Sequence, residues 1–451
     1  MNLLVRDGLL VTPEYLLRAD ILIEDGVIKE IGRSLRPPAG FEVLDASGML
    51  VLPGVVDEHV HMREPGLTYK DDFEHGSKAA AAGGVTTVVE MPNTLPPVDS
   101  GERLLEKAGL LEPKAYVDYA LYGVVHDGSV DKVKEMLEAG AVGFKVFLGP
   151  TTGNIPPPKL SSLVKLMELS EQHGFTVAFH AETHDIVEFF TERYKSQGSS
   201  PRLHELARPP LAEAHAIRTI GSIQEMVGGR SLIVHVSSRQ ALQAVSEFKN
   251  RGVQMYAETC PHYLVLSSDD YDKYGTLIKV NPPIRGREHA EELVRALNTG
   301  LIDTVGSDHA PHSPEEKKAG VWEAASGMPG VQTLLPLMID LALRGIVDLR
   351  RIPLLMARNP ARLFKLWPWK GEIAPGSSGD LVVVDPRAEH VIREEDLYYK
   401  HKTIPFIGWR LKGRVKYTIL RGNIVARDGV VEGRPLGSWI KPVDNMASKR
   451  F

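Results

Sequence analysis

The pattern of apolar and polar positions changes near residue 53. Before it, short apolar runs alternate with turn sequences such as Asp-Gly and Pro-Pro-Ala-Gly. This pattern predicts antiparallel strands, at residues 2–5, 9–11, 19–23, 27–31 and 43–46. After it, apolar runs of strand length alternate with stretches of helical periodicity. The second pattern indicates a different architecture for the middle of the chain.

Eight strand-then-helix units follow between residues 55 and 343. The expected strands are 55–61, 85–91, 116–125, 141–148, 176–181, 232–236, 253–259 and 303–305. The fifth strand is followed by two helices and each of the others by one. The expected helices are 73–82, 101–111, 130–139, 160–173, 186–196, 211–226, 239–249, 287–297 and 331–343. Almost continuously apolar strands are typical of parallel strands buried on both faces. Eight such units predict an α/β fold, a closed (β/α)8 TIM barrel with its active site at the carboxyl ends of the strands.

Strand signals return after the barrel. A helical stretch at 349–364 is followed by apolar runs at 380–384, 415–420 and 423–426. We expect the two chain ends to form one small β-sandwich domain beside the barrel. The predicted boundaries assign residues 1–52 and 367–451, including a C-terminal tail, to that domain, and residues 53–366 to the catalytic barrel.

Side chains that bind metals stand in or at the end of the expected strands. His59 and His61 lie two residues apart on the first barrel strand, so their side chains point to one face and can hold one metal ion. His180 and His235 lie on the fifth and sixth strands, and Asp308 lies where the eighth strand meets its loop. The alternatives are ordinary core histidines and an aspartate that caps the loop backbone. Nitrogen and oxygen donors of this kind suit zinc, and less selectively cobalt, manganese or nickel.

Lys145 lies inside the apolar fourth strand, where lysine is rarely found without a partner. One interpretation is that its ammonium reaches the barrel rim. The other is that burial lowers the pKa of the amine, which can then add carbon dioxide and form a carbamate that bridges two divalent metals. Such metals could share a hydroxide, because coordination lowers the pKa of water toward about 7. Asp308 would then take the proton during attack and return it to the departing nitrogen.

These motifs resemble those of the cyclic amidohydrolases of the amidohydrolase superfamily, which include dihydroorotases, allantoinases and hydantoinases. The resemblance covers nearly the whole chain and rests on residues 56–61, 143–145, 180–182, 235–237 and 307–309. It implies two Zn²⁺ ions that share a hydroxide and a carboxylated Lys145. It also implies their six ligands, with Asp308 as the catalytic base: His59, His61, Lys145, His180, His235 and Asp308.

Other motifs are similar to those of the dihydroorotase branch, at residues 61–66, 91–94, 280–283, 308–312 and 326–330. This likeness implies five substrate contacts: Arg63, Asn93, Asn281, His312 and the backbone near Gly327. An arginine fork can hold a ring carboxylate by two hydrogen bonds. The implied reaction is the reversible hydrolysis of dihydroorotate to N-carbamoyl-aspartate in de novo pyrimidine biosynthesis. Taken alone, Arg63 could instead pair with Glu64 or Asp71 at the barrel rim.

Some features point to other branches of the family. The segments 208–214 and 400–408 also occur in allantoinase-like sequences, and Glu90 is not typical of dihydroorotases. The first alternative is therefore an allantoinase or hydantoinase that applies the same chemistry to an uncharged ring. A second alternative is an inactive homologue that serves as a scaffold, which the complete ligand set disfavours.

Composition narrows the class of protein. A net charge of -5 without a basic tract argues against nucleic-acid binding. The single Cys260 excludes an internal disulfide and suits a reducing cytosol. The N-terminal apolar run is too short for a signal peptide, and no apolar stretch is long enough to span a bilayer. We expect a cytoplasmic enzyme with a small-molecule substrate and no membrane partner. The family likeness adds a homo-oligomer, and the scaffold alternative adds an association with aspartate carbamoyltransferase.

Overall fold

The computed structural model describes residues 2–150 and 155–443. In this part of the chain, eight parallel strands form one sheet in sequence order. They are β6 (Val55–Val60), β7 (Val85–Glu90), β8 (Asp118–Val124), β9 (Gly143–Phe147), β10 (Thr176–His180), β11 (Arg230–Ile233), β12 (Met255–Thr259) and β13 (Thr304–Val305). The His61 amide donates a hydrogen bond to the His309 carbonyl at 2.7 Å, next to a parallel bridge between Val60 and His309. This contact joins the last strand to the first, and the predicted barrel is confirmed.

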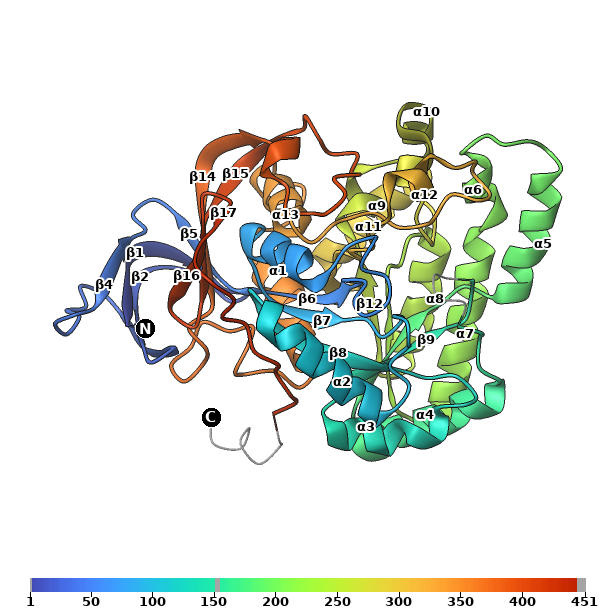
Figure 1. The fold of residues 1–451 in the computed structure, drawn as a ribbon, viewed down its shortest axis with the longest axis horizontal. Coiled ribbons are helices and arrows are strands. Elements are labelled where there is room, and N and C mark those ends of the chain that lie inside the picture. Colours follow the sequence, from blue (N-terminus) through green and yellow to red (C-terminus); the bar gives the residue numbers. More distant parts are fainter. Residues whose placement is uncertain (1, 151–154, 444–451) are drawn as a thin grey trace.

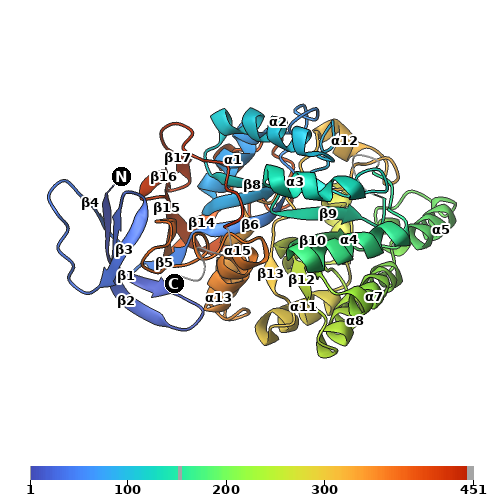
Figure 2. The same ribbon diagram turned by 90° about the horizontal axis from the view of Figure 1, so that it is seen from below.

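Helices surround the barrel sheet (Figures 1 and 2). The longer ones are α1 (Phe73–Ala82), α2 (Gly101–Leu111), α3 (Val133–Ala139), α4 (Leu160–His173), α5 (His184–Lys195), α7 (Pro210–Val227), α8 (Arg239–Asn250), α11 (Arg287–Thr299) and α13 (Leu334–Leu343). Short ones are α6 (Leu203–Ala207), α9 (Pro261–Val265), α10 (Tyr271–Tyr274) and α12 (Pro314–Lys318). Single 3₁₀ turns occupy Glu112–Lys114, Val130–Lys132, Ser268–Asp270, Gly275–Ile278 and Glu394–Asp396. Asp72, Ser100 and Ser238 cap α1, α2 and α8 through their side chains.

The helical stretch after the barrel closes the amino end of its interior. It consists of α14 (Arg351–Pro353), a π-helical turn (Leu354–Arg358) and α15 (Asn359–Leu363). Phe364 and Leu366 pack in one buried cluster with inward-facing residues of the barrel strands, including Val56 and Tyr122. Because this end is filled by apolar side chains, the polar side chains at the carboxyl ends of the strands are left to form a site.

The two chain ends pair in a second sheet, as predicted. Among the described residues it has nine strands. They are β1 (Leu3–Val11), β2 (Leu16–Glu24), β3 (Val27–Gly32), β4 (Glu42–Asp45), β5 (Leu50–Pro53), β14 (Leu381–Val391), β15 (Arg410–Leu420), β16 (Asn423–Arg427) and β17 (Val430–Val431). Strand β5 joins the ends, because it pairs with β1 on one side and antiparallel to β14 on the other. The sheet lies at one end of the molecule (Figure 1) and has its own core cluster. The boundaries after residues 52 and 366 stay predictions.

Two expected strands differ from the structure. Residues 2–5 and 9–11 belong to one strand, β1, because Asp7-Gly8 forms a bulge rather than a turn. Asp7 has a φ of 58° there, and a Cβ on Gly8 would lie 2.4 Å from Val51. Conversely, residues 50–53 form a strand, β5, that was not among the expected strands, and Gly54 separates it from β6. A Cβ on Gly54 would lie 2.2 Å from the Thr86 hydroxyl, so the crossing between the two sheets requires glycine.

Candidate metal and substrate site

Three of the predicted metal ligands converge on one point at the carboxyl end of the barrel. The Oδ1 atom of Asp308 lies 3.3 Å from His59 Nε2 and 3.4 Å from His61 Nε2. Two donors of a tetrahedral zinc ion, each about 2.0–2.1 Å from the metal, are roughly 3.3 Å apart. Both distances to Asp308 therefore have the spacing that one such cation requires, and the three donor atoms all lie within 4.8 Å of one another.

A second pair of donors lies beside the first set. His180 Nδ1 and His235 Nε2 are 2.9 Å apart, and the His59 and His235 rings are 5.4 Å apart. Lys145 is fully buried, and its Nζ atom has no hydrogen-bond partner in the described structure. An unpaired buried amine is costly, so this atom is suited to chemical change or to a ligand. All six predicted ligands line one cavity, and as a donor set they fit two cations.

Burial sets the protonation states of these groups. Desolvation lowers the pKa of His59 to about 3 and lowers the pKa values of His61, His180 and His235 below the ordinary value. The imidazoles are therefore neutral at pH 7, which is the form that binds a metal. Desolvation also lowers the pKa of Lys145 to about 8, so a fraction of its amine is neutral at physiological pH.

Oxygen atoms hydrogen-bond to the other nitrogen of His59 and His61, and a carboxylate lies close to the other nitrogen of His180. The pairs are His59 Nδ1–Glu258 Oε1 (2.8 Å), His61 Nδ1–Asn93 Oδ1 (2.7 Å) and His180 Nε2–Glu182 Oε2 (2.9 Å). Such partners fix the tautomer and orientation of a ligating imidazole. Of the three partners, Glu182 belongs to the family motif at residues 180–182.

Four of the five predicted substrate contacts line the cavity with the metal ligands: Arg63, Asn93, Asn281 and Gly327. Arg63 is 2% exposed. Its Nε donates to the Pro311 carbonyl at 3.0 Å, and its Nη2 lies 3.2 Å from His312 Nε2. In the described part of the chain, the rim pairing with Glu64 or Asp71 is not formed. Burial lowers the pKa of Arg63 to about 10, so its guanidinium stays charged at pH 7.

His312 lies behind Arg63 rather than among the residues that line the cavity. Its Nδ1 is 3.0 Å from Lys70 Nζ, and its Nε2 is 3.1 Å from the Ser326 carbonyl. Lys70 in turn pairs with Glu316 at 2.7 Å. Burial lowers the pKa of His312 to about 3, so the ring is neutral. In this structure His312 supports Arg63, and the sequence analysis missed both Lys70 and Glu316.

Three site residues have a backbone φ that L-amino acids rarely adopt. The angles are 65° for Arg63, 45° for His235 and 46° for Asp308. Each such conformation costs of order 1–3 kcal/mol and persists only where the surrounding structure imposes it. Backbone strain therefore coincides with the predicted chemistry at three separate strand ends.

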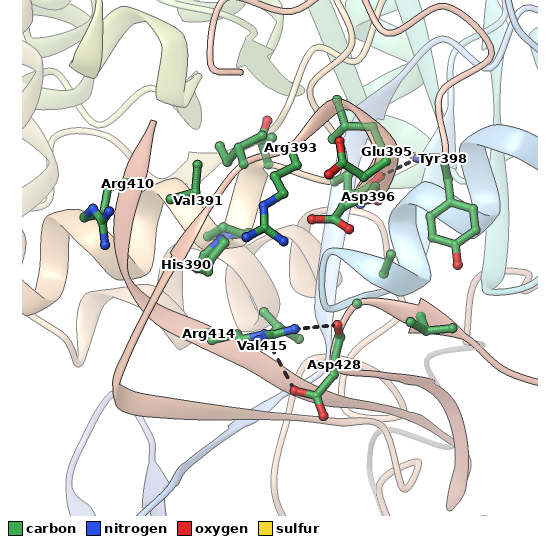
Figure 3. A pocket seen from close by; sticks show the side chains of 18 of the residues that line it. His390, Val391, Arg393, Glu395, Asp396, Tyr398, Arg410, Arg414, Val415 and Asp428 are labelled. Carbon is green, nitrogen blue, oxygen red and sulfur yellow. Dashed lines mark hydrogen bonds and ion pairs between the residues drawn. The ribbon is translucent and has the colours of Figure 1, made fainter. Parts of the chain in front are cut away.

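A second hollow, partly open to solvent, lies away from the barrel site, between β14, β15 and α13 (Figure 3). Its arginines are largely engaged by their own neighbours. Arg414 Nη2 donates to the Asp428 carbonyl at 3.1 Å, and Arg410 lies 3.6 Å from Glu389. None of the predicted site residues lines this hollow. The barrel cavity is therefore the candidate active site.

The model of the amidohydrolase family matches residues 50–425. The chain belongs to the amidohydrolase family. An allantoinase from Rubrobacter xylanophilus is 38% identical to this amidohydrolase over 94% of either chain. A dihydroorotase from Geobacter sp. (strain M21) is 36% identical over 95% of this chain and 100% of its own. The solved L-hydantoinase (dihydropyrimidinase) from Arthrobacter aurescens has a TM-score of 0.94 at 32% identity, covering 98% of this chain and 99% of that one.

Glu90, the residue untypical of dihydroorotases, is fully buried and pairs with Lys107 at 3.0 Å. Its other oxygen accepts a hydrogen bond from the Met62 amide at 2.9 Å, directly before Arg63.

Among the described residues, no helix has the length and apolar character needed to cross a membrane.

Proposed function

We propose that this amidohydrolase hydrolyses the ring amide of a small cyclic ureide or dihydropyrimidine, and closes the same ring in reverse, with a pair of zinc ions as its metal centre. The names of the relatives and the six donors around one cavity support this proposal. When bound, two divalent cations polarise a carbonyl and lower the pKa of a water molecule. Lys145, as a carbamate, would contribute a bridging carboxylate in place of an unpaired buried amine.

Asp308 moves the proton in this proposal. One of its oxygens faces the two histidines of the first strand. During hydrolysis the carboxylate takes the proton of the attacking water and returns it to the ring nitrogen as the C–N bond breaks. Ring closure runs the same transfers in the opposite order. The buried, neutral histidines are poorly suited to this task, because their lowered pKa values disfavour the protonated state.

The geometry favours dihydroorotate as the substrate, and the observation that carries this choice is Arg63. Its guanidinium is buried and charged, yet its hydrogen-bond partners are a carbonyl and a neutral imidazole. Carboxylates such as Asp308 and Glu90 act on this cation through space, but in the described structure none of them forms a hydrogen bond or ion pair with it. The ring carboxylate of dihydroorotate would supply such a partner beside the metal ligands, in the two-pronged geometry that arginine prefers.

Asn281 is a second support for a ring amide. Its Oδ1 atom is buried and has no hydrogen-bond partner in the described structure, although the side chain lines the cavity. An unsatisfied acceptor of this kind costs about 1–3 kcal/mol. A ring N–H of the substrate would satisfy it and would orient the ring relative to Arg63.

Allantoin or a hydantoin is the second candidate substrate, and the comparisons favour it over the first. The relative with 38% identity is named allantoinase, and the superposed structure is a hydantoinase, whereas the dihydroorotase is 36% identical. Opening either ring creates a carboxylate, so Arg63 could also bind the ring-opened product. This route would use the cation only after the C–N bond breaks.

One assay separates these candidates. Zinc-loaded protein is given dihydroorotate, allantoin and hydantoin side by side, and kcat/KM is measured for each. We expect the highest value for dihydroorotate. A higher value for allantoin or hydantoin would transfer the assignment to the second candidate. If no ring is opened and the protein also fails to bind zinc, the scaffold alternative replaces the enzymatic proposal.

A further inference from the structure

Lys317 is a buried cation that makes its hydrogen bonds only to backbone carbonyls. It lies in α12 and is 3% exposed. Its Nζ donates to the carbonyls of Lys279 (3.0 Å), Ala325 (3.1 Å) and Gly327 (2.9 Å). An ammonium has three N–H donors, so all of them are used. Desolvation lowers its pKa well below the ordinary value, and in the described structure no carboxylate pairs with it.

The three carbonyls belong to the two backbone segments that carry one side of the candidate site. Lys279 precedes Asn281 by two residues, and Ala325 and Gly327 flank Ser326. Asn281, Ser326 and Gly327 all line the cavity. The Gly327 amide also donates to the Lys279 carbonyl at 2.9 Å. Lys317 therefore stands where the two segments meet and fixes the distance between them.

The same short helix also contacts the residues behind Arg63. Glu316, next to Lys317, lies 2.7 Å from Lys70 Nζ and 3.5 Å from His312 Nδ1. His312 contacts Arg63. A capping box between Ser313 and Glu316 fixes the start of this helix. The helix thus links the residues behind Arg63 to the segments that carry Asn281 and Gly327.

Gly327 shows how little freedom this side of the cavity has. Its φ is 140°, and a Cβ at this position would lie 2.5 Å from the Ala310 carbonyl. Its N–H and its C=O are both engaged, by Lys279 and Lys317 respectively. The peptide around Gly327 is therefore held in place before any substrate arrives, which is the condition for binding a ring without a large ordering cost.

We propose that Lys317 is a positioning residue that sets the ring-binding side of the cavity and thereby determines substrate affinity. Its ammonium holds Asn281 and the segment 326–327 at the spacing that a ring amide needs. The inference rests on the proposed function only in that a ring amide binds in this cavity. It does not depend on which of the candidate rings is the substrate, because Lys317 touches neither Arg63 nor the metal ligands.

The test compares Lys317→Met and Lys317→Gln with the neighbouring control Lys318→Met, whose lysine is exposed. Met removes all three donors, whereas Gln retains two. Each variant is zinc-loaded, and KM and kcat are measured on the ring that the wild type opens fastest. Zinc content and thermal unfolding are recorded in parallel. We expect Lys317→Met to raise KM at least about tenfold with kcat within about threefold, Lys317→Gln to lie between Met and wild type, and Lys318→Met to match wild type.

The alternative is that Lys317 serves stability alone. Unchanged KM in a folded Lys317 variant would overturn the proposal, as would a fall in kcat with KM unaltered. If Lys317→Met does not fold, Lys317→Gln decides in the same way, and failure of both to fold would assign the ammonium to stability. A wild-type protein that opens no ring while Lys317→Met is stable and zinc-loaded would instead overturn the proposed function. The two failures are therefore distinguishable.

Discussion

The side chain of Asn93 contacts His61, one of the predicted metal ligands. Its Oδ1 atom lies 2.7 Å from His61 Nδ1, and both side chains are buried. The His61 ring is thereby turned so that its Nε2 faces Asp308. The family likeness implies a substrate contact for Asn93, and the structure adds a direct link from that residue to the metal site.

Replacing Asn93 with alanine should therefore weaken metal binding. Loss of a residue that orients a ligating histidine costs about 10- to 100-fold in metal affinity or activity. We expect Asn93→Ala to lose zinc to a competing chelator at a correspondingly lower chelator concentration. Asn93→Asp is the matched control, because it keeps an oxygen acceptor for His61. If Asn93→Ala retains zinc as well as wild type and only KM rises, the residue acts on substrate alone.

Arg63 is the residue that should separate a charged ring from an uncharged one. Arg63→Met removes the guanidinium and keeps an apolar stem of similar length. For dihydroorotate we expect KM to rise about 100-fold or more, since two charge-assisted hydrogen bonds together contribute about 3 kcal/mol or more. For allantoin or hydantoin the rise should be smaller. Arg427→Met in the terminal sheet, where the side chain is exposed, is the control and should leave both values unchanged. Intact dihydroorotate kinetics in Arg63→Met would remove dihydroorotate as the substrate.

Lys145 gives a pH dependence that can be measured during assembly of the metal centre. Its pKa is lowered to about 8, so the neutral, carbon-dioxide-accepting amine is present in about a tenth of molecules at pH 7 and in about nine-tenths at pH 9. Metal-free protein is mixed with Zn²⁺ at a fixed concentration of dissolved carbon dioxide. We expect the rate of activity recovery to rise with pH from 7 to 9 and then to level off.

The control for this experiment is the same reconstitution without carbon dioxide. Activity should then return slowly or not at all, and Lys145→Met should show no dependence on carbon dioxide. Recovery that is equally fast without carbon dioxide would show that the amine itself, rather than a carbamate, is present in the active protein.

The regular elements could be predicted because their signals are local. The helix predicted at 160–173 matches α4 residue for residue, since an amphipathic pattern ends at Gly174, which has a φ of 65°. The change of pattern near residue 53 could be predicted, but β5, the strand directly before Gly54, could not. The apolar run continues across Gly54, and only the contact with Thr86 shows why the chain changes sheets there.

The residues of the candidate site differ in the same way, because some carry a signal in the sequence and others do not. Five of the six predicted ligands carry a chemical signal of their own, because imidazoles and an amine are unusual in apolar strands. Lys70 and Lys317 carry no such signal, since charged residues in polar loops are ordinary. The contact of Lys70 with His312 joins positions 242 residues apart, and Lys317 meets carbonyls that the sequence does not distinguish. Such residues are found only when the fold brings their partners together.

Breaking the buried ion pair of Glu90 and Lys107 should lower the free energy of unfolding. Glu90→Gln would leave the Lys107 ammonium buried beside a neutral amide, with the Met91 carbonyl as its remaining partner at 2.9 Å. Breaking a buried pair by removing one partner costs about 3–5 kcal/mol. We expect a loss of this size in the free energy of unfolding, measured by denaturant titration of zinc-loaded protein. Glu106→Gln, on the exposed face of the same helix as Lys107, is the matched control and should change it by less than about 0.5 kcal/mol.

The Glu90–Lys107 pair also contacts the backbone next to two residues of the candidate site. Glu90 accepts the Met62 amide and Lys107 donates to the Met91 carbonyl, so the pair ties the segment before Arg63 to the segment before Asn93. A double variant, Glu90→Leu with Lys107→Leu, removes both charges and should regain part of the lost stability. It should not regain the KM of the wild type, because the backbone contacts at Met62 and Met91 would still be missing. A double variant with wild-type KM would show that the pair serves stability and leaves the position of Arg63 unaffected.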